Sequence, residues 1–288
     1  MDDLERISHG GYGGASVAAP GRYRYTAGQV LHRHRHDTGY AAVVLTGSYV
    51  EAGDTGRHRV TQGDVIVHQR YESHLNRFDA HGSEVLVLPL AGGWDAPVIG
   101  QCENIDVIAH LAERSPAKAV SALKGQLKAR RPQFEDWPDM LAADLIADPD
   151  ICIAQWARSH QIHRGSVSRG FRQQFGLTPA GFRCAARAQR AARAIADSRT
   201  ALAEIALAAG FADQAHMGNA VRRLMGIPPM ALRRRTQATA KRIVREAHLQ
   251  ALPIPTKRSI EDWGGTHKSG ARLVSGSSRS ARPRQSSD

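Results

Sequence analysis

The chain has 288 residues, 42% of them hydrophobic, and a formal net charge of +12. This length predicts about two domains. The sequence lacks an apolar run of roughly 18 residues, and its acidic start, MDDLERISHG, differs from a secretory signal, so a cytoplasmic protein without membrane contact is expected. Three widely separated cysteines, Cys102, Cys152 and Cys184, are expected to be reduced and structural.

The basic charge is concentrated in one part of the sequence. Residues 151–237 contain 14 arginines, no lysine and three acidic side chains, whereas residues 1–150 contain 15 basic and 20 acidic side chains. Arginine can bind phosphate groups and guanine edges through two parallel hydrogen bonds. The charge distribution therefore predicts that segment 151–237 binds a polyanion.

Residues 22–90 have the pattern of a β domain. Short apolar runs, AAVVL at 41–45, DVIVH at 64–68 and EVLVLPL at 84–90, are separated by Gly, Asp and Ser clusters. Many short strands with turn signals between them predict a small barrel or sandwich.

A helical pattern begins after Gly100. From Pro116 to Arg130, apolar residues recur at helical spacing, with Ser115 as the N-cap. This helix is expected either to pack on the β domain or to form a dimer face. From Pro138 onward the chain is expected to be helical.

A degenerate repeat occupies the arginine-rich segment. The sequence FRQQFGLTP at 171–179 returns as VRRLMGIPP at 221–229, and each copy follows a short helical pattern, IAQWA at 153–157 and LAEIA at 202–206. Two short helices before each Gly-apolar-x-Pro closure predict two helix-turn-helix units.

The second helix of each unit is expected to have a buried face and an exposed one. Helices are predicted at 153–159 and 164–175 in the first unit and at 202–209 in the second, where Gly210 supplies the turn and Asp213 caps the last helix. The apolar residues of the second helices are expected in the core, namely Val167, Phe171, Phe175, Met217, Val221 and Leu224. The opposite faces carry residues that can contact DNA, namely Arg164, Ser168, Arg169, Arg172, Gln214, Ala215, His216, Asn219, Arg222 and Arg223.

A predicted helix from Thr178 to Asp197 joins the two units. About 20 residues that rise about 1.5 Å each make a rod of about 30 Å. Successive major-groove faces on one side of B-DNA are about 34 Å apart. The connecting helix can therefore present the two units to neighbouring grooves.

The repeat resembles the DNA-binding domain of the AraC/XylS family of bacterial transcription regulators, most specifically in AEIALAAGF and GIPP. The resemblance implies base-reading positions at Gly165, Ser168 and Arg169 in the first unit and at Ala215, His216 and Asn219 in the second. The sequence departs from the family at three positions. Gln161 replaces a glycine of the first turn, Gly165 offers no side chain to a base, and Val221 replaces a phenylalanine.

Two segments of the β domain carry several histidines. The first, LHRHRHDTGY, places His32, His34 and His36 at a period of two, so all three are expected on one face of a strand. The second, GDVIVHQRYESH, supplies His68 and His74. Together the two segments resemble the two motifs of a cupin barrel, which AraC-like regulators often carry as a sensor. The glutamate of a cupin metal site has no match near residues 38–40, and glutamine replaces the usual proline at position 69.

Three interpretations of these histidines are open. They can be neutral imidazoles that face an organic effector, with His32, His34, His36, Tyr40 and His74 as effector-binding residues. They can bind a divalent metal through His32 or His34 together with His36 and His74. They can also be exposed and without a role. The resemblance favours the first interpretation, so neither a metal nor another cofactor is expected.

The predicted fold class is α+β. It comprises a cupin-like β-barrel sensor at 8–92, a helical linker or dimer face at 93–137, an all-α double helix-turn-helix domain at 138–236 and a basic, mostly disordered tail at 237–288.

The expected function is that of a transcription factor which binds specific DNA sequences under the control of a small molecule and has no enzyme activity. Its expected partners are double-stranded DNA, the effector, RNA polymerase and a second copy of the chain. The alternative is a metal-dependent cupin enzyme or metal sensor fused to a DNA-binding module.

Overall fold

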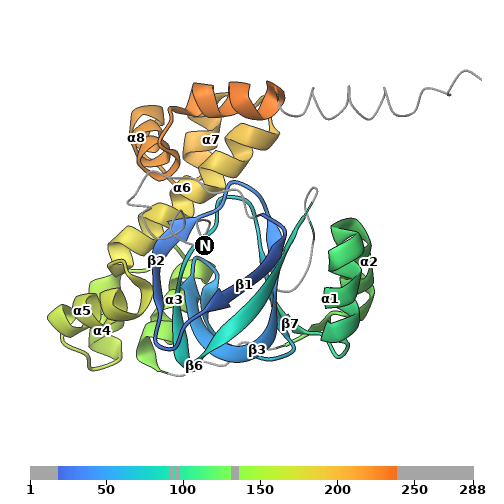
Figure 1. Ribbon diagram of the computed structural model, residues 1–288. Helices are drawn as coiled ribbons and strands as arrows, with labels where there is room; N and C mark the ends of the chain where they lie inside the picture. Colours follow the sequence, from blue (N-terminus) through green and yellow to red (C-terminus); the bar gives the residue numbers. More distant parts are fainter. Residues whose placement is uncertain (1–18, 91–93, 95–97, 131–135, 239–288) are drawn as a thin grey trace, which may run out of the picture. The chain divides into compact units, whose positions relative to one another are not determined.

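Figure 1 shows the computed structural model, which describes residues 19–90, 94, 98–130 and 136–238. All of these residues belong to the first of the two units into which the chain divides, residues 1–240. The predicted basic tail lies almost entirely outside the described residues.

The N-terminal part of the described chain is one antiparallel sheet of eight strands. Their order is β1-β6-β3-β5-β7-β8, while β2 pairs with β6 and β4 pairs with β3. The strands are β1 (Gly21–Tyr25), β2 (Val30–Arg35), β3 (Tyr40–Gly53), β4 (Gly56–Thr61), β5 (Asp64–His68), β6 (Ser73–Pro89), β7 (Ile99–Gln101) and β8 (Lys128–Ala129). The predicted β domain is confirmed. The pairings among the described strands do not close the sheet, so the closed barrel stays a prediction.

The sheet is buried on both faces. One apolar cluster, here called the inner cluster, includes Tyr40, Val44 and Phe78. A second cluster on the opposite face joins residues of β3, β5 and β6 to Ile108 of α1 (Ile105–Arg114) and Leu123 of α2 (Pro116–Gln126). The two helices therefore cover the second face of the sheet.

Helix α2 begins as predicted but is shorter. Ser115 Oγ accepts a hydrogen bond from the backbone N–H of Lys118 at 3.4 Å. The helix ends at Gln126 instead of Arg130, because the chain becomes extended there and β8 pairs with β7. Helix α1 was not predicted. The buried side chains of Ala119 and Leu123 agree with the expectation that α2 packs on the β domain. The other expectation, a dimer face in this linker, stays a prediction.

The rest of the described chain is helical, as predicted. Its helices are α3 (Trp137–Ala147), α4 (Ile153–Ser159), α5 (Arg164–Phe175), α6 (Pro179–Asp197), α7 (Leu202–Ala208) and α8 (Gln214–Met225), followed by a helical segment through residue 238. Helices α5 and α8 end in the same way, because Gly176 and Gly226 both adopt a φ of 71° that favours glycine. The predicted bounds of the repeat helices agree with the structure to within one residue.

Helix α6 lies between the two helix-turn-helix units, with α4 and α5 near one end and α7 and α8 near the other (Figure 1). At the first end, the Phe182 ring packs edge-on against Phe171 and Phe175, each with a ring-centroid distance of 5.5 Å. At the second end, a row of buried alanines on α6 contacts Met217 and Val221 of α8. Alanine side chains allow the two helix backbones to approach closely.

The turns of the two units share one backbone feature. Gly210 follows α7 with a φ of 80°, and Gln161 follows α4 with a φ of 55°. The left-handed conformation is costly for a residue with a Cβ atom. Gln161, which stands where the first turn was expected to have glycine, therefore still adopts the backbone conformation that glycine favours.

All three cysteines are free, but only Cys102 is buried, so the predicted structural role fits Cys102 alone. No helix in the described part of the chain has the length and apolar character needed to cross a bilayer.

Two glycines in the repeat provide a matched test of packing. A Cβ atom at Gly170 of α5 would lie 2.5 Å from Trp137 Cζ2, whereas a Cβ atom at Gly218 of α8 would have its nearest neighbour, Pro229 Cγ, at 4.0 Å. We expect Gly170→Ala to lower the free energy of unfolding by about 1–3 kcal/mol because of the clash. Gly218→Ala should raise it by up to about 1 kcal/mol through helix propensity. Urea unfolding followed by circular dichroism measures both values, and changes of the same sign would contradict the packing described.

The N-cap of α8 gives a second test. Asp213 Oδ1 accepts a hydrogen bond from the backbone N–H of His216 at 2.7 Å. Asp213→Ala should lower the free energy of unfolding by about 1 kcal/mol, whereas Asp213→Asn keeps an acceptor oxygen and should lose less. Equal losses in the two variants, measured by urea unfolding, would show that the cap hydrogen bond contributes nothing.

Candidate functional site

Helices α5 and α8 expose most of the residues predicted to contact DNA. The exposed ones are Arg164, Arg169, Arg172, Gln214, Ala215, His216, Asn219, Arg222 and Arg223, while Gly165 and Ser168 are partly buried. The predicted core residues of the two helices are buried except Leu224, which is partly exposed beside the buried Met225. Each second helix therefore has the two faces that its periodicity predicted.

The arginines of these exposed faces differ in their partners from two of the arginines of α6. Within the described residues, the five arginines on the exposed faces of α5 and α8 form no ion pair. By contrast, Arg187 of α6 pairs with Asp150, and Arg193 of α6 pairs with Glu72 at 2.9 Å. The arginines on α5 and α8 thus retain guanidinium donors for an external anion.

A pocket opens on the side of the sheet that carries the inner cluster. It encloses about 590 Å³ of atom-free space, including its opening to solvent, and β1, β2, β3, β5 and β6 all contribute to its lining. Part of the wall is apolar and includes Leu31, Phe78 and Val87. The polar part, here called the histidine cluster, consists of His34, His36, Tyr40, Glu51, His68 and His74.

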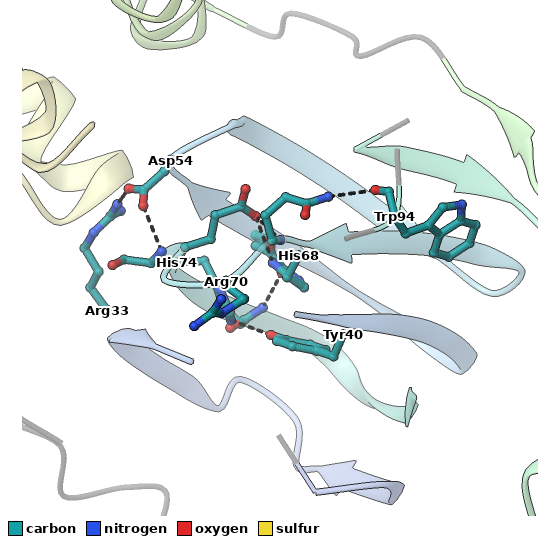
Figure 2. A network of polar contacts seen from close by, with 12 residues as sticks. Arg33, Tyr40, Asp54, His68, Arg70, His74 and Trp94 are labelled. Atoms are coloured by element: carbon teal, nitrogen blue, oxygen red, sulfur yellow. Dashed lines mark hydrogen bonds and ion pairs between the residues drawn. The ribbon is translucent and has the colours of Figure 1, made fainter. Parts of the chain in front are cut away.

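The side chains of the histidine cluster are in close contact. The His74 ring lies 4.4 Å from the His34 ring and 4.5 Å from the His68 ring, measured between centroids. The Tyr40 ring stacks on His68 at 4.4 Å, and its hydroxyl lies 3.3 Å from His74 Nε2 (Figure 2). The cluster can therefore donate or accept protons and hydrogen bonds at several adjacent atoms.

Glu51 supplies the only carboxylate of the histidine cluster as defined here. Its side chain is 2% exposed, and its Oε2 lies 3.5 Å from His68 Nε2. The same oxygen accepts a hydrogen bond from Asn76 Nδ2 at 3.1 Å. Glu51 and His68 thus form a buried ion pair when His68 is protonated.

Burial and charge divide the histidines into two kinds. Burial lowers the pKa of His34 and, with the neighbouring histidines, holds the pKa of His74 well below its usual range. Burial also acts to lower the pKa of His68, but the carboxylates of Glu51, Glu72 and Asp54 together outweigh it and the pKa of His68 is raised. Burial acts to raise the pKa of Glu51, yet His68 and the hydrogen bonds outweigh it and the pKa of Glu51 is lowered. A charged pair therefore lies beside imidazoles that favour the neutral form.

Four of the five predicted effector-binding residues line the pocket, namely His34, His36, Tyr40 and His74. His32 does not, because the register of β2 against β6 shifts between Leu31 and His34, and the His32 side chain is exposed. The expectation that three histidines share one face was therefore wrong for His32.

Glu51 was not predicted as a pocket residue. Simple alternation along β3 from Tyr40 would place even-numbered residues in the pocket, but two register shifts follow, between Val44 and Thr46 and between Gly47 and Tyr49. After these shifts the odd-numbered residues Tyr49 and Glu51 line the pocket. The one sign of this pocket residue in the sequence is a glutamate within a largely apolar strand.

Comparison with known proteins identifies the helical segment. Residues 156–235 match a family model described as a helix-turn-helix domain. No curated protein sequence matches the chain.

Several solved structures share partial similarity with the chain. Apo ToxT K231A from Vibrio cholerae is 11% identical with a TM-score of 0.34, covering 75% of this chain and 97% of that one. ToxT from the same organism bound to an unsaturated fatty acid is 11% identical with a TM-score of 0.34, covering 73% and 93%. An AraC-type regulator from Chromobacterium violaceum is 23% identical with a TM-score of 0.28, covering 30% and 77%. These TM-scores are too low to support the assignment, which depends on the family match and the repeat geometry: residues 156–235 are an AraC-type helix-turn-helix domain.

Proposed function

We propose that the chain is a transcription regulator that binds specific DNA sequences through α5 and α8 and responds to a small molecule bound in the pocket. The observation that carries the proposal is the pair of helices with exposed, donor-rich faces on the two units of an AraC-type domain. Exposed arginine, asparagine, glutamine and histidine side chains can contact phosphates and base edges.

The length of α6 supports binding to two neighbouring grooves. Its 19 residues, at about 1.5 Å each, make a rod of about 28 Å. That length is comparable with the pitch of B-DNA, about 34 Å. Because the exposed faces differ in composition, with more arginine on α5 and more uncharged polar residues on α8, the two half-sites should differ in sequence.

Strand β2 offers a route from the pocket to the DNA-binding helices. His34 lines the pocket, while its neighbour Arg33 donates a hydrogen bond to the Phe175 carbonyl at 3.1 Å, and Arg35 donates to the Leu224 carbonyl. These carbonyls belong to α5 and α8. A ligand that binds one position of β2 better than another would change these contacts and thereby the DNA affinity.

The proposal is for a regulator without enzyme activity. A response to the effector requires only that the pocket bind it, and the DNA-binding helices provide the output. RNA polymerase and a second copy of the chain are proposed as further partners of this regulator.

Arg169→Ala tests the DNA-binding helices. If Arg169 reads a base, the substitution should weaken specific binding by about 1–3 kcal/mol and relax the preference at one base position. The measurement is a gel-shift titration at fixed salt on a site first selected from genomic fragments bound by the purified protein. The matched control is Arg24→Ala, which removes the same charge from a side chain on β1 that is 83% exposed.

The control variant should bind as the unaltered protein does. If Arg169→Ala also binds unchanged, Arg169 is not a base-reading residue. If the unaltered protein shows no sequence preference at any salt concentration, the proposed function is wrong.

A further inference from the structure

We infer that the pocket binds one divalent transition-metal ion through Glu51, His68 and His74. One ligand atom from each residue lies within 4.8 Å of the others, and all three residues are buried. They come from β3, β5 and β6, and β3 pairs with both other strands, so the sheet itself holds the three side chains together. Two imidazoles and one carboxylate form a donor set that binds Zn²⁺ and Fe²⁺.

The separations are close to those of a bound site. Ligand atoms about 2.0–2.1 Å from a tetrahedral metal lie about 3.3 Å from each other. Glu51 Oε2 and His68 Nε2 are 3.5 Å apart. The ring nitrogen of His74 needs only a small movement to complete the site, because all three ligand atoms already lie within 4.8 Å of one another.

Unsatisfied ring nitrogens point to the same conclusion. Among the described residues, His74 Nδ1 is buried without a hydrogen-bond partner, and buried His68 Nε2 has only its 3.5 Å ion-pair contact with Glu51. A buried polar atom without a partner is costly, and a metal ion would satisfy such nitrogens. The Tyr40 hydroxyl, 3.3 Å from His74 Nε2, is placed to orient the imidazole as an outer partner of the metal site.

A second set, His34, His36 and His74, also falls within 4.8 Å and shares His74 with the first. This set contains no carboxylate, and His34 and His36 are only partly buried. A buried cation requires compensating negative charge, which Glu51 provides in the first set alone. The set containing Glu51 is therefore favoured, even though the H-x-H spacing in the sequence pointed to the other.

The site goes beyond the proposed function, because DNA binding by α5 and α8 does not require it. The first experiment treats the purified full-length protein with chelator and titrates it with Co²⁺ and then Zn²⁺. We expect one Co²⁺ per chain with the visible absorption of a four- or five-coordinate ion, and its displacement by Zn²⁺. A spectrum of hydrated Co²⁺ with no bound stoichiometric metal would overturn the inference and leave the DNA-binding proposal intact.

Near-isosteric variants distinguish the two sets. Glu51→Gln and His68→Gln should each weaken Co²⁺ binding by about tenfold or more, because each removes a ligand. His34→Gln should leave the affinity within about threefold, as should His32→Gln, the control for exposed histidine on the same strand. If His34→Gln abolishes binding and Glu51→Gln does not, the metal site is the other set and the inference is wrong. Circular dichroism of each metal-free variant checks folding, and the titration of the unaltered protein decides the question if a variant does not fold.

Discussion

The packing of α5 and α8 against one helix, α6, is the constraint on which the DNA-binding geometry depends. Phe182 fixes α5 at one end, and the buried residues Ala188, Ala191 and Ala192 allow α8 to approach closely at the other. Because α6 is a rigid helix, its length sets the separation of the two exposed faces and its twist sets their relative rotation, so both follow from the same 19 residues. A larger side chain in the alanine row would therefore displace one of the exposed faces as well as disturb the core.

The helical part could be predicted from sequence because its signals are local. Thr178 caps α6, Gly176 and Gly226 end α5 and α8, and the apolar residues recur at a period that only a helix accommodates. These features act within about four residues of the backbone they determine. The helix at 105–114 was not predicted, although three of its residues are buried against the sheet and the helix beside it. Its stability depends on packing against the sheet and that helix, and the local sequence contains no signal of this packing.

The pocket was only partly predictable because strand registers are not local. Alternation from Tyr40 would direct Ala52 into the pocket, but the shifts in β3 direct Glu51 there, and Ala52 packs with the helical part instead. A one-residue shift reverses the faces of all later residues in a strand, and the net effect of the irregularities between Val44 and Tyr49 is one such reversal. The histidine motifs thus indicated where the pocket lies, whereas its carboxylate, and with it the favoured metal ligands, depend on bulges that only the structure shows.

Alternation along β2 gives the pocket and the DNA-binding helices a common structural element. The strand presents His34 to the pocket while Arg33 and Arg35 reach the carbonyls of Phe175 and Leu224, which lie in the last turns of α5 and α8. Carbonyls at a helix C-terminus lack partners within the helix and carry partial negative charge, so an arginine there is favourable. Both arginines are mostly buried, so withdrawing them would leave charge or carbonyl groups without partners. Two alternative positions of β2 would therefore be separated by discrete changes in hydrogen bonding, which is the property that a ligand-controlled switch requires.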